Sequence, residues 1–306
     1  MHVAIIEPLG VERTLVERLM GEVEGVTFDY FDRRTCDQDE LARRARKAEA
    51  VVVANAPITE RMLAQCPDLK MLSVAFTGLD HIDLAYCDEH GIRVANCAGY
   101  STEAVAEEVF GLAISLLRHL GECDRRVRAG AGREGLVFRE LRGKTLGVVG
   151  NGAIACRVME IARAFGMDLV CHARTERPIE GVRYMGLEEV CRRADVLTLH
   201  VPATPSTTHL IGERELGLMK PDAILVNCAR GPVVDTDALV RALEEGRIAG
   251  AGLDVFDTEP PLEPGLPILA APNTQLAPHI GFATVEALCE RARLAIGHVA
   301  NYARAV

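Results

Sequence analysis

Three polar side chains with complementary chemistry follow strand-like segments in the last third of the chain, each beside Gly or Pro. They are Arg230, Glu259 and His279. A guanidinium can bind a carboxylate and polarise a carbonyl group, and an imidazole can exchange a proton near neutral pH. A carboxylate beside the imidazole would orient the ring and favour its protonated form. Reduction of a 2-oxo acid, for example, requires a cation that holds the carboxylate and polarises the ketone, and a group that protonates the developing alkoxide, and these residue types have those chemistries.

Each of the three also has an ordinary structural interpretation. Arg230 could cap a strand, Glu259 could be a solvated loop acid, and His279 could be a hydrogen-bonded loop histidine. A lone histidine is more often such a loop residue, because catalysis requires a partner group. The chemical interpretation therefore depends on a fold that brings the three side chains to one place.

A glycine-rich turn forms a second constellation. The apolar run 145–149 predicts a buried strand, and the segment Gly150-Asn151-Gly152-Ala153-Ile154-Ala155 follows it directly, ahead of a predicted helix at 156–165. In this context Gly150 would make a tight turn, Gly152 would let the backbone approach a pyrophosphate, and Ala155 would allow close packing of helix on strand. The amino terminus of the helix would stabilise the phosphates. The flanking strand and helix favour dinucleotide binding over a plain turn.

The end of the next predicted strand bears on the choice between NAD and NADP. NAD-selective domains place an acid there to bind the ribose 2′-hydroxyl, whereas this chain has Ala173 followed by Arg174, Thr175 and Arg177. These side chains could bind a 2′-phosphate. Alternatively, the arginines are exposed loop residues beside Glu176. We expect NADP(H) to be favoured over NAD(H).

The elements that must position these residues are predicted by alternating short β-rich runs and amphipathic stretches. This alternation predicts the α/β class, with parallel sheets covered by helices. A first series of strands is expected at 3–7, 27–31, 50–54, 70–75 and 93–95. A second series, in the order of a doubly wound nucleotide-binding domain, is expected at 146–150, 169–172, 196–200, 223–227 and 248–253.

Helices are predicted at 40–48, 80–90 and 284–303, and a long one at 101–120 could connect two domains. The last helix has no strand after it and could pack back onto the first domain. We therefore expect a discontinuous domain, residues 1–99 with 282–306, and an inserted domain, residues 100–281.

Composition limits the class of partner. A length of 306 residues suggests about two domains, and the net charge of −10 without a Lys/Arg run argues against nucleic acid. No apolar stretch approaches the roughly 20 residues of a membrane helix, and the first residues lack a signal peptide's pattern, so we expect a cytoplasmic protein with no membrane partner. The ten cysteines never form a CxxC pair. We expect reduced, mainly buried thiols and no metal site.

Four segments, in this order and at these separations, resemble the D-isomer-specific 2-hydroxyacid dehydrogenase family: GNGAIA at 150–155, NCARG at 227–231, LDVFDTEPP at 253–261 and APHIG at 277–281. GLDHID at 78–83 and STEAVAEE at 101–108 extend the resemblance over nearly the whole chain. The resemblance implies two doubly wound domains, with a Rossmann-type NAD(P)-binding domain inserted into a flavodoxin-like substrate-binding domain. It also implies a homodimer formed through the cofactor domain and an arm, here about 120–144.

Residue by residue, the resemblance implies that Arg230 binds and polarises the substrate, His279 is the acid/base and Glu259 is its partner. The substrate carboxylate would be bound by the loop Ala75, Phe76, Thr77 and Gly78, with Tyr100 and Ser101 nearby. The residues expected to face the cofactor are Gly150, Asn151, Gly152, Ala153, Ile154, Ala173, Arg174, Thr175, Arg177, His200, Val201, Pro202, Thr207, Cys228, Ala229, Arg230, Asp254, His279 and Gly281.

The chain departs from the family pattern at the substrate side. Phe76 stands where many members have Gly, Ser101 stands where several have Asn, and the chain contains no Trp. Phe76 and Tyr100 could be pocket walls or simple packing residues. The expected activity is hydride transfer between NADP(H) and a small 2-oxo or D-2-hydroxy acid, such as glyoxylate or hydroxypyruvate. The alternatives are a phosphoglycerate dehydrogenase without a regulatory domain and, in a different class, a nucleotide-sensing, corepressor-like binding protein.

Overall fold

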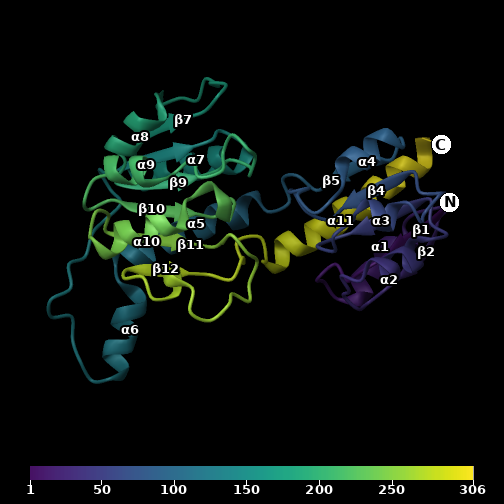
Figure 1. The fold of residues 1–306 in the computed structure, drawn as a ribbon, viewed down its shortest axis with the longest axis horizontal. Helices are drawn as coiled ribbons and strands as arrows, with labels where there is room; N and C mark the ends of the chain where they lie inside the picture. Colours follow the sequence, from purple (N-terminus) through teal and green to yellow (C-terminus); the bar gives the residue numbers. More distant parts are fainter. Residues whose placement is uncertain (306) are drawn as a thin grey trace. The chain divides into compact units, whose positions relative to one another are not determined.

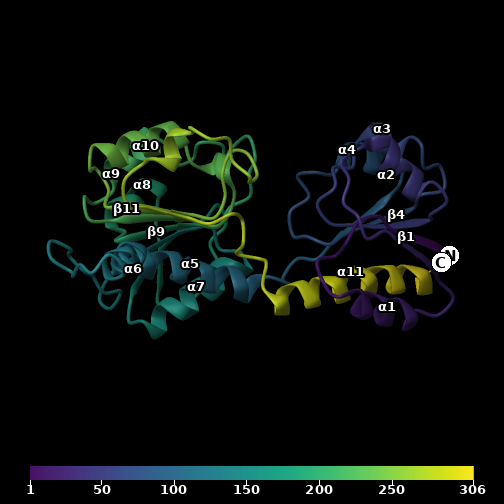
Figure 2. The same cartoon turned by 90° about the horizontal axis from the view of Figure 1, so that it is seen from below.

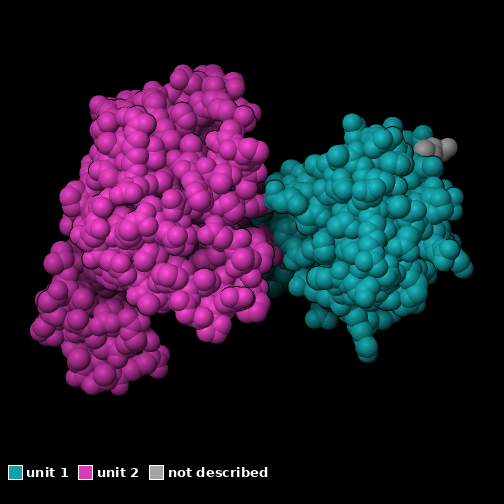
Figure 3. Space-filling view, viewed as in Figure 1, with its two compact units in different colours: residues 1–101, 283–306 teal, residues 102–282 magenta. Residues whose placement is uncertain are grey.

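The computed structural model describes residues 1–305 and divides them into two compact units (Figure 3). Unit 1 contains residues Met1–Ser101 and the segment that begins at Ala283, and unit 2 is the continuous segment Thr102–Phe282. Tyr100 and Ser101 therefore belong to unit 1, together with the loop 75–78. Arg230, Glu259 and His279 all belong to unit 2.

Unit 1 is built on a five-stranded sheet in the order β2-β1-β3-β4-β5. Every pairing in it is parallel, and its order is that of flavodoxin-like folds. Its strands are β1 (His2–Ile5), β2 (Thr27–Tyr30), β3 (Ala50–Val53), β4 (Met71–Val74) and β5 (Arg93–Asn96). Its helices are α1 (Arg13–Gly21), α2 (Gln38–Ala45), α3 (Glu60–Leu63), α4 (Leu84–Glu89) and α11 (Val285–Ala305).

Unit 2 is built on a seven-stranded sheet in the order β12-β11-β10-β9-β6-β7-β8. All its pairings are parallel too, and the order is that of a Rossmann fold with one added edge strand. The strands are β6 (Thr145–Val149), β7 (Asp168–His172), β8 (Val182–Tyr184), β9 (Val196–Leu199), β10 (Ile224–Asn227), β11 (Gly250–Leu253) and β12 (Thr274–Leu276). The helices are α5 (Thr102–Leu117), α6 (Leu120–Arg128), α7 (Ala153–Ala164), α8 (Leu187–Arg193), α9 (Glu213–Leu218) and α10 (Thr236–Glu244), with 3₁₀ turns at Gly231–Val233 and Pro267–Leu269.

Helices cover both faces of each sheet (Figure 2). In unit 2, α8, α9 and α10 lie on one face while α5 and α7 lie on the other, and the central strands β9 and β10 are buried along their whole length. In unit 1, α11 packs on β3 and β4 beside α1, so the end of the chain completes the layer over the first sheet. The predicted α/β class and the return of the last helix are confirmed.

Two predicted helix starts are corrected by capping. The helix predicted at 40–48 begins at Gln38, because the Asp37 carboxylate accepts hydrogen bonds from the backbone N–H groups of the first turn. The helix predicted at 80–90 begins only at Leu84, because Asp83 accepts from the N–H of Tyr86. In both places a short acidic side chain decides the boundary.

The long helix predicted at 101–120 is wrong at its end. The structure ends α5 at Leu117 and starts α6 at Leu120, with His119 between them at φ 47°. A residue in this left-handed region cannot continue a right-handed helix. The turn redirects the chain, so that α6 and the loop after it project from unit 2 (Figure 1). We call residues 120–144 the arm.

Candidate active site

The side chains of His279 and Glu259 meet at the carboxyl edge of the unit 2 sheet. The Nδ1 atom of His279 lies 2.7 Å from Oε2 of Glu259. His279 follows β12 and has φ 56°, a conformation that non-glycine residues rarely adopt and that is often found at functional positions. Its side chain is 25% exposed and that of Glu259 is 70% exposed, so the pair can be reached from solvent.

Asp254 holds the loop that carries His279. It is buried at the end of β11, and its two carboxylate oxygens accept hydrogen bonds from the N–H groups of Ile280 at 2.7 Å and Gly281 at 2.8 Å. A Cβ atom on Gly281 would lie 2.9 Å from Asp254 Oδ2, so glycine is needed for this close approach. Burial raises the pKa of Asp254, while the two backbone N–H groups oppose that change.

Arg230 is positioned by the turn that follows β10. The buried side chain of Asn227 accepts a hydrogen bond from the N–H of Ala229 at 3.0 Å and donates one to the carbonyl oxygen of Arg230 at 2.9 Å. The next residue, Gly231, is so close to the backbone of Phe256 that a Cβ atom would lie 1.9 Å from its carbonyl oxygen. The loops that carry Arg230 and Glu259 are therefore locked against each other.

Sheet order explains why the predicted trio shares one edge. Arg230, Glu259 and His279 follow β10, β11 and β12, which are adjacent parallel strands. The carboxyl ends of parallel strands lie at the same edge, where open α/β sheets bind ligands. The structure thus places Glu259 in direct contact with His279. It places Arg230 at the same edge, where the neighbouring Gly231 packs against the loop that leads to Glu259. A guanidinium, an imidazole and its carboxylate partner can there bind an anion and move a proton.

The predicted dinucleotide turn has the geometry that a pyrophosphate requires. Gly150 has φ 106°, and a Cβ atom there would lie 2.3 Å from the carbonyl oxygen of His200. Gly152 caps α7, and a Cβ atom on it would meet no heavy atom within 4 Å. The first hydrogen bond of the helix runs from the N–H of Cys156 to Gly152, so the preceding N–H groups have no partner within the helix. This open, positively polarised turn fits a dinucleotide.

The segment after β7 lies beside this turn. Arg174, Thr175 and Arg177 are exposed and Ala173 is partly buried. The side chain of Asn151 donates to the carbonyl oxygen of Thr175 at 2.6 Å, which ties the segment to the glycine turn. A cation at this position can therefore reach a group bound at the turn.

The other residues predicted to face the cofactor lie at the same edge of the sheet. His200 follows β9, its Nε2 atom lies 3.0 Å from the hydroxyl of Thr198, and burial lowers its pKa to about 4. Thr207 donates to the carbonyl oxygen of Pro202 at 2.6 Å and closes the loop that follows Val201. Burial raises the pKa of the Cys228 thiol well above its usual range. His200 and Cys228 are therefore neutral near pH 7.

In unit 1, the loop 75–78 follows β4 at the carboxyl edge of that sheet. The carbonyl oxygen of Phe76 accepts from the N–H of Cys97 at 2.9 Å, and that of Thr77 accepts from the Asn96 side chain at 2.7 Å. In a trans peptide the C=O and the following N–H point in opposite directions. The N–H groups of Thr77 and Gly78 therefore point away from the end of β5, as a backbone anion site would require.

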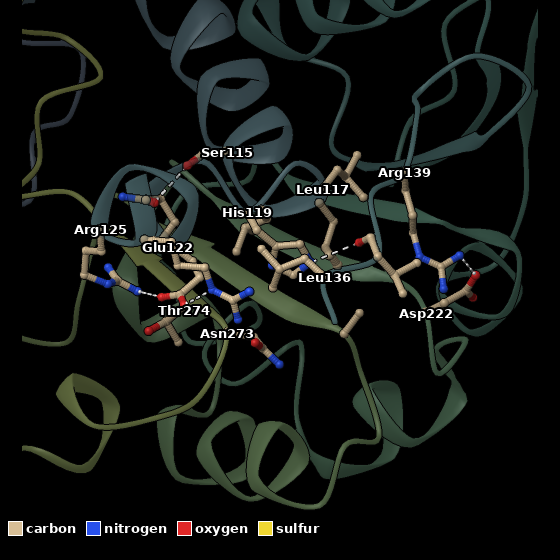
Figure 4. Close-up of a pocket in the computed structure, with 17 residues that line it drawn as sticks. Ser115, Leu117, His119, Glu122, Arg125, Leu136, Arg139, Asp222, Asn273 and Thr274 are labelled. Carbon is tan, nitrogen blue, oxygen red and sulfur yellow. Dashed lines mark hydrogen bonds and ion pairs between the residues drawn. The ribbon is translucent and has the colours of Figure 1, made fainter. Parts of the chain in front are cut away.

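A separate cavity of about 360 Å³ lies at the opposite, amino edge of the unit 2 sheet (Figure 4). Ile224, Ala249 and Asn273, at or just before the starts of β10, β11 and β12, line it together with the base of the arm. Arg139 and Asp222 form an ion pair of 2.8 Å at one side of it. Because the trio follows the other ends of the same strands, this cavity is not part of the candidate active site.

Sequence reasoning missed two residues around the trio. Asn227 was recognised only as part of a motif, although an Asn two residues before a turn N–H is a known turn former. Glu108, on α5, is not among the predicted site residues. Its pKa is raised by burial and, to a smaller extent, by the nearby Asp254. Its side chain lies next to Gly281, since a Cβ atom on that glycine would be 3.7 Å from Glu108 Cγ. Only the tertiary structure reveals that contact.

Other findings concern metals and membranes. Among the described residues, no group of three or more His, Cys, Asp and Glu side chains could hold a metal ion. No helix within residues 1–305 is long and apolar enough to cross a membrane. All ten cysteines are free, but only five are buried and Cys36 is exposed.

Comparisons with known proteins agree with this site. The model of the NAD binding domain of D-isomer specific 2-hydroxyacid dehydrogenases matches residues 110–281. A glyoxylate reductase of Aeropyrum pernix is 41% identical over 297 residues, covering 90% of this chain and 88% of that protein. A D-3-phosphoglycerate dehydrogenase of Methanocaldococcus jannaschii is 37% identical, over 94% of this chain but 54% of that protein. The solved structure of an acyclic imino acid reductase with NADPH and D-Arg matches with a TM-score of 0.91 and 30% identity, covering 99% and 97% of the two chains.

The family assignment has independent support from fold, site and sequence. The sheet order, the glycine turn at Gly150 and the pairing of His279 with Glu259 are seen without reference to any relative. The matched NAD-binding domain covers more than half of the chain and includes all three residues. The chain belongs to the D-isomer-specific 2-hydroxyacid dehydrogenase family and is an NAD(P)-dependent oxidoreductase.

Proposed function

We propose that this enzyme reduces a small 2-oxo acid, such as glyoxylate or hydroxypyruvate, to the D-2-hydroxy acid with NADPH. The observation that carries the proposal is the 2.7 Å contact between His279 and Glu259 at the sheet edge that also carries Arg230. Glyoxylate reductases among the relatives support the substrate class. The reverse reaction uses the same groups.

Each residue of the trio has one task in this reaction. Arg230 binds the substrate and polarises its ketone oxygen, which gains negative charge as the reaction proceeds. His279 donates its Nε2 proton to that oxygen, while Glu259 accepts the hydrogen bond from Nδ1–H and fixes the ring orientation. Asp254 keeps the backbone after His279 in place through its two hydrogen bonds. A bound nicotinamide dinucleotide supplies the hydride.

The preference for NADP(H) is part of the proposal. Phosphate recognition would come from Arg174, Thr175 and Arg177, next to the glycine turn, and Ala173 would place no carboxylate against the 2′-phosphate. The acyclic imino acid reductase that resembles this chain was solved with NADPH.

The preference for NADP(H) can be tested by substitution. The double variant Ala173→Asp/Arg174→Ser should shift the NADPH-to-NADH ratio of kcat/KM toward NADH by at least about tenfold. An unchanged ratio would remove these residues from cofactor selection.

The substrate carboxylate is proposed to bind the N–H groups of the loop 75–78, beside Tyr100 and Ser101 in unit 1. A phosphoglycerate dehydrogenase is the second candidate, because one relative carries that name. A phosphorylated substrate would favour cationic side chains in the binding loop, and the loop Ala75-Phe76-Thr77-Gly78 has none. This composition favours the smaller acids.

The test is the initial rate of NADPH and NADH oxidation with six acids: glyoxylate, hydroxypyruvate, pyruvate, phenylpyruvate, 2-oxoisocaproate and phosphohydroxypyruvate. We expect turnover with NADPH to be fastest for glyoxylate or hydroxypyruvate. Preference for phosphohydroxypyruvate would establish the second candidate instead. Tight binding of NADPH without turnover of any acid would overturn both and favour a nucleotide-sensing role.

We also propose that two copies associate through the arm. None of the nine residues of α6 is buried, and three large apolar side chains of the arm are exposed: Leu120 at 50%, Val127 at 72% and Val137 at 69%. Apolar side chains that are exposed on a projecting segment can mark an interaction site. The arm extends beyond the rest of unit 2, where a second copy could cover it.

A further inference from the structure

Arg291 is a buried cation in unit 1 that no step of the proposed reaction uses. It lies on α11, its side chain is 1% exposed, and its Nη2 atom donates to the carbonyl oxygen of Leu9 at 2.6 Å. Burial lowers its pKa from the ordinary arginine value, and the neighbouring Tyr100 acts in the opposite sense. Placing a guanidinium in a core is costly unless its neighbours compensate for the loss of water.

The guanidinium contacts two aromatic residues of the proposed substrate side. Its central carbon lies 4.6 Å from the ring centroid of Phe76 and 5.9 Å from that of Tyr100. The two rings meet edge to face, with centroids 6.2 Å apart and planes at 86°. A planar cation over an aromatic face is attracted to the electron-rich ring and restricts its rotation, more strongly when water is excluded.

These contacts join separate loops at the carboxyl edge of one sheet. Leu9 follows β1, Phe76 follows β4, and Tyr100 follows β5. The turn after β5 is tied to the same residue, because the thiol of Cys97 lies 3.6 Å from the carbonyl oxygen of Arg291. A Cβ atom on Gly10 would lie 3.1 Å from Nη2, so the first loop closes tightly on the guanidinium. Arg291 is the common partner of all these loops.

We propose that Arg291 is a positioning residue that fixes the Phe76 ring within the substrate loop 75–78 and thereby restricts the enzyme to 2-oxo acids with small side chains. This inference rests on the proposed function. Phe76 is partly exposed, and its carbonyl oxygen is fixed by Cys97. Because the guanidinium holds the Phe76 ring, it fixes the direction of the Thr77 and Gly78 N–H groups. It also limits the space for a substrate side chain beside them. The buried positive charge also favours the binding of a carboxylate.

Two substitutions remove the stacking of the guanidinium on Phe76, one with the charge kept and one with the charge lost. Arg291→Lys keeps a cation but loses the planar group that stacks on Phe76, whereas Arg291→Met keeps an unbranched apolar stem and loses the charge. Arg293→Met is the matched control, because Arg293 lies on the same helix but is exposed. Phe76→Leu removes the ring and leaves Arg291 in place.

The experiment measures KM and kcat for glyoxylate and phenylpyruvate, the Kd of NADPH, and inhibition by oxalate, a carboxylate probe that is not turned over. Both Arg291 variants should raise KM for glyoxylate and the inhibition constant of oxalate about tenfold, with kcat and the Kd of NADPH within about threefold of wild type. The phenylpyruvate-to-glyoxylate ratio of kcat/KM should rise at least about tenfold, since a released ring leaves more room. Arg293→Met should behave as wild type.

A double variant tests whether Arg291 acts through Phe76. If it does, Arg291→Lys/Phe76→Leu should have the same acid preference as Phe76→Leu alone, because residues in one contact are not additive. Additive changes, or an acid preference and KM unchanged in folded Arg291→Lys, would overturn the proposal while leaving the proposed function intact. Absence of turnover and oxalate binding in the wild type would instead overturn the proposed function, and with it this inference.

Discussion

At the residue scale, the candidate site depends on side chains that are held by their neighbours. The ring of His279 is held by Glu259 at Nδ1. Its backbone, at a φ of 56°, is held by Asp254, which accepts hydrogen bonds from the N–H groups of the next two residues. Arg230 is fixed by the Asn227 turn and by Gly231. His279 is the proposed general acid, and such a group acts only when it is closely aligned with its substrate.

The first prediction concerns the trio itself. His279→Ala or Arg230→Ala should lower kcat/KM for the best 2-oxo acid by about two to four orders of magnitude, because each removes a group that acts in the transition state. Neither substitution should change the Kd of NADPH by more than about threefold. Stopped-flow reduction and fluorescence titration of NADPH would measure the two quantities. Near wild-type turnover in either variant would exclude that residue from the chemistry.

The second prediction concerns His200. Its pKa is about 4 in the folded protein and about 6.5 in an unfolded chain. Between these pH values the unfolded state binds the proton and the folded state does not, so the free energy of unfolding decreases as pH falls from 6.5 toward 4. The contribution is complete above pH 6.5 and amounts to about 3 kcal/mol.

Urea unfolding at pH 7 and pH 5 would measure this dependence. The decrease in unfolding free energy between the two pH values should be smaller in His200→Gln than in wild type, since glutamine does not titrate. His90→Gln, which alters an exposed imidazole, serves as the control and should keep the wild-type dependence. Equal slopes in wild type and His200→Gln would show that another group dominates this pH range.

At the element scale, the carboxyl ends of the strands position the residues of the candidate site. The loops after β10, β11 and β12 reach one edge because those strands are neighbours and parallel. The glycine turn after β6 faces the loop after β9, where the strand order reverses and an open sheet leaves a crevice. A parallel sheet therefore converts distant sequence segments into one site without long loops.

The third prediction separates folding from binding at the glycine turn. Gly150→Ala should lower the free energy of unfolding by at least about 2 kcal/mol, because its φ of 106° is strained for alanine and the methyl group would overlap the His200 carbonyl oxygen. Gly152→Ala should change stability by no more than about 0.5 kcal/mol, since open space surrounds that position. It should nevertheless weaken NADPH binding at least about tenfold, as its methyl group projects where phosphate would bind.

Thermal unfolding with and without NADPH would measure both effects on the same samples. Stabilisation by ligand follows the ratio of its concentration to Kd. Wild-type stabilisation by NADPH in Gly152→Ala would place the dinucleotide away from this turn. Wild-type stability of Gly150→Ala would show that the loop after β9 can move aside.

Which of these features could be predicted from sequence follows from the range of the interactions involved. Ten strand positions could be predicted from apolar runs, whereas the short strands β8 and β12 were not among the predicted strands. The location of Arg230, Glu259 and His279 at strand ends could be predicted as well, because each lies beside Gly or Pro after an apolar run. The start of α4 at Leu84 could have been predicted from Asp83, a recognisable N-cap. By contrast, the left-handed turn at His119 and the packing of Glu108 near Asp254 depend on tertiary contacts. Arg291 could not be singled out either, since only the folded chain places its guanidinium over Phe76.

At the scale of the whole molecule, the chain forms two units, each with a hydrophobic core of its own. Unit 1 has its own apolar cluster around β1, β3 and β4, while the sheet of unit 2 separates two clusters, one on each face. Residues 283–305 return to unit 1 and supply α11, and with it Arg291. The order of elements along the chain thus places the last helix beside the proposed substrate loop.

The last prediction tests association through the arm. Val127→Glu combined with Val137→Glu places charges on the two most exposed large apolar side chains of the arm. An interface that buries them cannot accommodate unpaired carboxylates, so sedimentation equilibrium should show a dimer of the 33.2 kDa chain for wild type and a monomer for the double variant at micromolar concentration. Val285→Glu, at a 74% exposed apolar residue outside the arm, should remain dimeric. A dimer that survives the arm substitutions, or that dissociates with Val285→Glu, would place the contact elsewhere on the molecule.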